Sequence, residues 1–183
     1  MKKLLLPGFI ILGLLLNSCG KSYDEYLSQA DELQAAKDYE SALTSIDKAA
    51  GKAETGPQRI AANIKAGNLA SQQLKDLEKA NTYYSATLSD IADYSAGDLR
   101  DLAKQALAAQ ANKAAVSMYK LWFEKFPEAD NIVEMKYEFA EVYHKNIRDL
   151  SNAIKTYNGI VADYPDSEQA PKALFSIGYI YAN

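Results

Sequence analysis

Residues 149–167 read DLSNAIKTYNGIVADYPDS, and this stretch decides the fold class. In it, Ala153 is followed four residues later by Tyr157 and twelve residues later by Pro165. The same three positions recur upstream as Ala115, Tyr119 and Pro127. The offset in numbering is 153 − 115 = 38, and self-similarity at a fixed period of this size is typical of a repeat architecture.

The same period continues toward the amino terminus. Ala42 and Ala80 are offset by 80 − 42 = 38, and the next step, to Ala115, is 115 − 80 = 35. A small residue precedes three of the alanines at offsets of 42 − 30 = 12, 80 − 67 = 13 and 153 − 140 = 13, and these small residues are Ala30, Gly67 and Ala140. Apolar residues recur at helical spacing, without the sustained alternation of strands. The pattern therefore predicts paired helices stacked into a solenoid.

These residues resemble the tetratricopeptide repeat, in which a small residue in the first helix and an alanine in the second let two helices approach closely. The resemblance is most specific at residues 149–167, which are similar to repeats of bacterial envelope proteins that end in Tyr-Pro-Asp-Ser. It implies an all-α fold, an α-solenoid of antiparallel helix pairs wound into a right-handed superhelix. The implied repeat-core positions are Ala30, Ala42, Gly67, Ala80, Ala115, Ala140, Ala153 and Gly178.

We expect helix pairs at about 22–50, 57–93, 98–126 and 131–163, and a fifth helix from about residue 168 onward. Together they form one repeat domain at 23–183. Pro165 cannot continue a helix, and Ser167 can cap the next one through its hydroxyl. The fifth helix carries Phe175 and Ile177 with no second helix to cover them, so we expect the domain to be truncated within its fifth repeat.

The amino-terminal segment 1–22 predicts export and lipidation. A basic start is followed by the apolar run Leu4–Leu16, which is too short for a membrane span of roughly 20 residues but typical of a signal peptide. Leu16-Asn17-Ser18-Cys19 then resembles the lipobox of bacterial lipoproteins. The resemblance implies a signal peptide at 1–18, an acylated Cys19 with a short tether at 19–22, and anchoring by acyl groups such as palmitate. Gly20 in place of aspartate favours the periplasmic face of the outer membrane.

Composition argues against several classes of function. Cys19 is the single cysteine, so neither an intrachain disulfide nor a multi-thiolate zinc site can form. Without Lys2 and Lys3 the charge becomes 18 − 24 = −6, which does not favour nucleic acid binding. The lone His144 follows Tyr143 near a helix end; a general base or a pH switch is one interpretation, and a solvated residue is the other. No nucleophile motif or phosphate loop accompanies it, so we expect no catalytic residue, metal or cofactor.

The tetratricopeptide resemblance implies a concave groove lined by the first helices, which takes a peptide or a helix of another protein. The candidate groove residues, all on first helices, are Asn63, Lys65, Asn68, Lys136, Tyr137 and Glu141. We expect envelope proteins as partners and no small-molecule substrate. Similar in class are the repeat lipoprotein of the outer-membrane β-barrel assembly machinery and the repeat protein that accompanies the Tol–Pal system. The alternatives are a glycan-binding helical lipoprotein and the amino-terminal repeat array of a larger protein.

Overall fold

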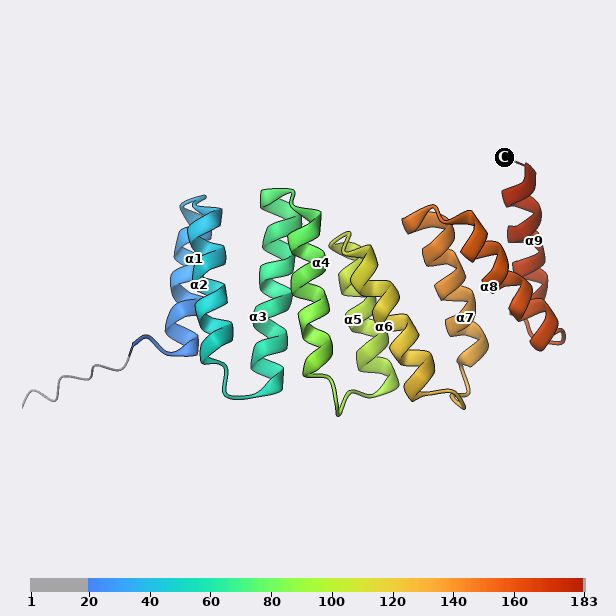
Figure 1. Ribbon diagram of the computed structural model, residues 1–183, viewed down its shortest axis with the longest axis horizontal. Helices are drawn as coiled ribbons and strands as arrows, with labels where there is room; N and C mark the ends of the chain where they lie inside the picture. Colours follow the sequence, from blue (N-terminus) through green and yellow to red (C-terminus); the bar gives the residue numbers. More distant parts are fainter. Residues whose placement is uncertain (1–19, 183) are drawn as a thin grey trace, which may run out of the picture.

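The computed structural model describes residues 20–182, and all regular structure in that range is helical. The helices follow one another in chain order along the long axis, with α1 and α9 at opposite ends (Figure 1). The signal peptide at 1–18 and the acylation site Cys19 lie outside the described residues. Within them, no helix combines the length and hydropathy that crossing a membrane would require.

The helices form antiparallel pairs joined by short connections, which confirms the predicted all-α solenoid. The second helix of each pair packs on its own first helix, and α2, α6 and α8 also contact the first helix of the next pair. Three short segments extend the helices: the π-helical turns η1 and η3 continue α3 and α7, and the 3₁₀ turn η2 ends α4. The bounds are α1 (Tyr23–Ala35), α2 (Tyr39–Lys52), α3 (Gly56–Leu69), η1 (Ala70–Leu74), α4 (Leu77–Ala86), η2 (Thr87–Ser89), α5 (Ala96–Ala108), α6 (Asn112–Lys125), α7 (Ile132–Glu141), η3 (Val142–Ile147), α8 (Leu150–Asp163) and α9 (Gln169–Ala182).

In each complete pair, a residue with a left-handed backbone follows the end of the first helix within two residues. These four residues recur at the same steps as the alanines of the second helices, and they are Lys37, Lys75, Gln110 and Arg148. In three pairs the next residue is an aspartate that caps the second helix. The side chains of Asp38, Asp76 and Asp149 accept from the backbone N–H three residues later, at 3.3, 2.9 and 3.0 Å. The tight turn and the cap together reverse the chain direction within three or four residues.

The π-helical turns explain why the small-residue spacing alternates between 12 and 13. The offset from Ala30 to the left-handed Lys37 is 37 − 30 = 7, but from Gly67 to Lys75 it is 75 − 67 = 8. In the first pair the Asp38 N–H reaches back five residues to the carbonyl of Leu33, and in the second the Asp76 N–H reaches back six, to Ala70. The wider turn η1 absorbs the additional residue without breaking the helix. η3 does the same in the fourth pair.

The positions predicted for the repeat core are buried at the helix crossings, with one exception. Ala30, Ala42, Ala80, Ala115, Ala140 and Ala153 are completely inaccessible to solvent. A Cβ added to Gly67 would lie only 2.7 Å from the ring of Tyr84. The prediction of a buried position is wrong for Gly178. This residue is exposed, because its face of α9 contacts none of the described helices. The third pair uses Ala103, a buried alanine that the sequence analysis did not single out.

The buried side chains gather in three successive clusters, centred on α1–α3, on α3–α7 and on α7–α9. Each cluster draws on three or more successive helices, so neighbouring pairs share buried side chains. The central cluster holds Trp122, which is 1% exposed and donates its indole N–H to the carbonyl of Ala96 at 2.9 Å. The one tryptophan of the chain is therefore a core residue and cannot stack on a sugar ring.

Candidate functional site

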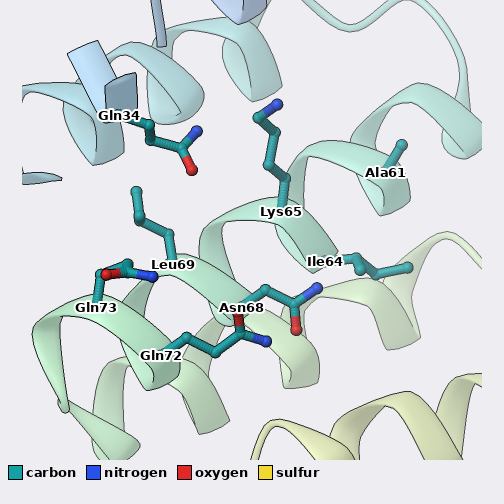
Figure 2. A pocket seen from close by; sticks show the side chains of 8 residues that line it. All are labelled: Gln34, Ala61, Ile64, Lys65, Asn68, Leu69, Gln72 and Gln73. Carbon is teal, nitrogen blue, oxygen red and sulfur yellow. The ribbon is translucent and has the colours of Figure 1, made fainter. Parts of the chain in front are cut away.

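The side of the solenoid formed by first helices carries a hollow of about 420 Å³ between α1 and α3. We call it the amide hollow, because four of its lining side chains end in carboxamides: Gln34, Asn68, Gln72 and Gln73. The remaining lining residues are Ala61, Ile64, Lys65 and Leu69. Figure 2 shows Gln34 approaching from α1, while the other residues come from α3 and its continuation η1.

Helical spacing brings the residues of α3 and η1 onto one face. Lys65, Asn68 and Gln72 follow one another at steps of three and four residues, which is one turn of a helix. Lys65 and Asn68 were predicted groove residues, and the structure brings these two together. Gln34, Gln72 and Gln73 were not predicted from the sequence. A signal for Gln72 was present, because it lies one turn after Asn68.

Lys65 and Asn68 connect the amide hollow to the rest of the fold. The Lys65 ammonium lies 2.5 Å from the carboxylate of Asp31, so an ion pair joins the first helices of two successive pairs. Both groups are partly exposed, which limits the contribution of this pair to stability. Asn68 accepts a hydrogen bond at 2.9 Å from the hydroxyl of Tyr84, and burial raises the pKa of Tyr84 to about 12. The hydrogen bond fixes the Asn68 side chain at the rim.

Much of the hydrogen-bonding capacity of the amide hollow is unused. The carboxamides of Gln72 and Gln73 have no hydrogen-bond partner in the described part of the chain, and the NH₂ group of Asn68 has none. Gln34 makes one long bond, of 3.4 Å, to Asp31. A carboxamide presents a donor beside an acceptor, as a peptide group does, so it can pair with main chain whatever the sequence. The apolar floor of Ala61, Ile64 and Leu69 can cover a side chain.

The first helices of the third and fourth pairs have a different polar surface. Arg100 of α5 donates to Glu134 at 2.7 Å and to Glu138 at 2.5 Å, both on α7. Glu138 also accepts from the buried hydroxyl of Tyr119 at 2.5 Å. These groups satisfy one another, so this stretch of the groove is a structural bridge between two pairs. In the amide hollow, by contrast, polar groups stay available.

The other predicted groove residues are distributed differently. Tyr137 places its hydroxyl 3.3 Å from that of Ser176 on α9, and Glu141 accepts from the hydroxyl of Tyr157 at 2.6 Å. These two residues therefore join α7 to α8 and α9. Asn63 does not line the amide hollow.

The groove prediction is wrong for Lys136, because its side chain faces the second helices. It pairs with Asp163 at 3.7 Å and lies 4.8 Å from the centre of the Tyr164 ring, both at the end of α8. The reason is helical phase. Lys136 and Asn63 each lie four residues before the small residue of their helix, one turn away on the side that packs toward second helices.

His144 is not the solvated residue of the second interpretation. Its ring is half-buried 6.2 Å from the ring of Tyr179, and its Nδ1 atom is buried without a hydrogen-bond partner. Among residues 20–182, no group of three or more histidine, cysteine or acidic side chains has the arrangement of a metal site.

Comparisons with protein-family models and with curated proteins find no match. Solved structures show remote similarity of fold. A tetratricopeptide repeat protein from Parabacteroides merdae has a TM-score of 0.45 and 21% identity over 84% of this chain. A kinesin light chain with nearly identical TPR-like repeats, from Podosopora anserina, has a TM-score of 0.45 and 12% identity over 87% of it. The chain spans 58% of the length of the first protein and 85% of the second.

Proposed function

We propose that this chain is a membrane-tethered tetratricopeptide-type scaffold that binds a segment of another cell-envelope protein in the amide hollow. One observation carries the proposal. Four carboxamides surround an apolar floor, and each of them has at least one hydrogen-bonding group without a partner in the described residues. An extended segment would satisfy these groups with its main chain and bury a side chain on Ile64 and Leu69. Peptide recognition commonly combines main-chain hydrogen bonds with pockets for side chains.

The proposed location is the periplasmic face of the outer membrane. Its support is the signal-like run before residue 18, the lipobox-like Leu16-Asn17-Ser18-Cys19 and Gly20 after the cysteine. More than one acyl group on Cys19 would make a stable anchor, whereas a single chain binds a membrane only marginally. The scaffold would then act within reach of proteins of the same membrane. We propose no catalytic role.

The peptide-binding proposal can be tested with a phage-displayed peptide library selected on residues 20–183. We expect the selected peptides to lose at least tenfold in affinity for Gln72→Ala/Gln73→Ala, because both changes remove carboxamides from the rim. Gln169→Ala, at the start of α9 and outside the amide hollow, is the control and should bind as the wild type does. Peptides that bind the double variant equally well would refute the assigned site.

Anchoring has its own test. Cys19→Ala in the full chain should abolish incorporation of a labelled fatty acid and move the protein out of the membrane fraction, because the thiol that carries the acyl group is gone. A Ser18→Ala variant keeps the thiol and should still be labelled. Incorporation of the label into Cys19→Ala would overturn the lipoprotein assignment, while leaving the peptide-binding proposal intact.

A further inference from the structure

A second hollow, of about 440 Å³, lies on another side of the solenoid, between the second helices α6 and α8, with α7 beneath them. We call it the lysine hollow, because three of its lining residues are lysines, one from each helix. Its lining residues are Lys120, Phe123, Lys136, Phe139, Tyr143, Asn152, Lys155, Thr156 and Gly159. None of them lines the amide hollow, and the α7 residues lie on the face opposite Tyr137 and Glu141.

The rim of the lysine hollow is positively charged in a protein that is otherwise acidic. The whole chain carries a formal charge of −4, yet no aspartate or glutamate lines this hollow. Lys120 and Lys155 are exposed and form no ion pair with the described residues, whereas Lys136 is paired with Asp163. Two ammonium groups are therefore free to bind an anion. Such a local potential of opposite sign to the net charge selects acidic partners.

The floor of the lysine hollow is aromatic. The rings of Phe123 and Phe139 are 5.6 Å apart, and those of Phe139 and Tyr143 are 4.6 Å apart, so the three form a continuous surface. Gly159 of α8 adds depth, because a Cβ built on it would meet nothing within 4 Å. The hollow thus offers an apolar surface of side-chain size directly beside two unpaired cations.

We propose that the lysine hollow binds an acidic peptide segment of a partner protein, with an apolar side chain on the aromatic floor and flanking carboxylates on Lys120 and Lys155. A membrane surface fits less well. Each basic residue near an anionic leaflet contributes only about 1 kcal/mol, and the net negative charge of the chain opposes that attraction. A concave aromatic floor matches a single protruding side chain better than a layer of headgroups.

The test uses residues 20–183, which include the three buried clusters, and the blocked peptide acetyl-Asp-Glu-Phe-Asp-Glu-amide. Titration with NMR detection should shift the resonances of Phe123, Phe139 and Gly159. Lys120→Glu/Lys155→Glu should weaken binding at least tenfold, because it places like charges opposite the carboxylates. Lys37→Glu/Lys172→Glu makes the same change in net charge at exposed lysines elsewhere and should leave affinity within twofold. If both double variants lost the same affinity for the peptide, the change in net charge alone would explain the loss. That result would overturn the proposed site.

A second variant blocks the lysine hollow without altering charge. Gly159→Leu places a side chain in the open space and should abolish binding while keeping the fold, because nothing lies within 4 Å of the added Cβ and leucine favours a helix more than glycine does. Unchanged affinity in this variant would overturn the proposal. So would equal binding of the neutral peptide acetyl-Asn-Gln-Phe-Asn-Gln-amide, or a stronger response to phosphatidylserine vesicles than to the peptide. Gln72→Ala/Gln73→Ala should still bind the acidic peptide, so this proposal and the amide-hollow proposal can fail independently.

Discussion

Gly67 and Gly178 occupy equivalent repeat positions in opposite surroundings. A Cβ on Gly67 would lie 2.7 and 2.8 Å from two ring carbons of Tyr84, whose ring is fully buried and whose hydroxyl is bonded to Asn68. Gly67→Ala should therefore lower the free energy of unfolding by about 1–3 kcal/mol through overpacking. Gly178→Ala should raise it by up to about 1 kcal/mol, because alanine favours the helix and meets no neighbour. Urea unfolding measures both, and equal shifts would contradict the assigned packing.

Tyr84 also makes stability depend on alkaline pH. Burial raises its pKa from 10.0 to about 12 in the folded protein, so the folded state keeps the proton longer than the unfolded chain does. The contribution of Tyr84 to the free energy of unfolding is complete below pH 10. It is lost as the pH rises from 10 through about 12. Tyr84→Phe should therefore lose less stability than the wild type between about pH 9 and 12. Thermal melts across this range measure it, and Tyr181→Phe, at a tyrosine that is 75% exposed, should follow the wild-type curve.

At the scale of elements, α6 is capped by its neighbour. Its N-cap residue is Ala111, which has no side-chain acceptor, where three other second helices have an aspartate. The Oδ1 atom of Asn81 on α4 takes that role, accepting from the N–H groups of Lys113 at 2.9 Å and Ala114 at 3.1 Å. A helix cap thus also joins the second pair to the third, so its loss should weaken both α6 and the contact between pairs.

Removing this cap should have a measurable effect on stability. Asn81→Ala should lower the free energy of unfolding by about 1–2 kcal/mol, because two N–H groups lose their acceptor. Asn81→Asp keeps the Oδ1 acceptor and should retain most of the stability, whereas an aspartate at Ala111 itself would bury a carboxylate in the central cluster. Thr82→Ala changes the next residue of α4, which is exposed, and should have a smaller effect. An Asn81→Ala protein with wild-type stability would show that the cap is dispensable.

The elements were predictable where the pattern is strong. The fourth pair was expected at 131–163, and the structure has Ile132 to Asp163 from the start of α7 to the end of α8. The π-helical turns were not predicted, although the spacings of 12 and 13 contained their signal. An additional residue can lengthen a loop or widen a helix, and spacing alone does not distinguish these outcomes. The left-handed positions were missed because lysine, glutamine and arginine occupy them in place of glycine.

The candidate site was predictable only in part, for a related reason. Asn63, Lys65 and Asn68 were all chosen because they lie on the same first helix, and the structure places only Lys65 and Asn68 in the amide hollow. Helical phase separates them: Asn63 lies four residues before Gly67, whereas Asn68 lies one residue after it. Lys136 likewise lies four residues before Ala140, so helical phase would have placed it on the side of the second helices and outside the groove. Gln34 required the tertiary contact of α1 with α3, which no local pattern contains.

At the scale of the whole molecule, stability is distributed along the solenoid. The three buried clusters follow one another along the chain, and helices contact mainly their own pair and the adjacent pairs. In such an array, a destabilised repeat affects its nearest neighbours most. Ala153 belongs to the cluster of α7–α9 and is completely buried. A larger side chain there should weaken one end of the molecule and leave the other largely unaffected.

Ala153→Leu tests this distribution. Overpacking should lower the stability of the fourth pair by about 1–3 kcal/mol. Native-state hydrogen exchange should then show faster exchange in α7, α8 and α9, with rates in α1, α2 and α3 close to those of the wild type. Gly67→Ala is the matched variant in the second pair and should speed exchange in α3, α4 and the adjacent helices more than in α8 and α9, because Gly67 packs against Tyr84 of the central cluster. A uniform increase along the chain in both variants would mean that all pairs unfold as one cooperative unit, in which case the nearest-neighbour description would be wrong.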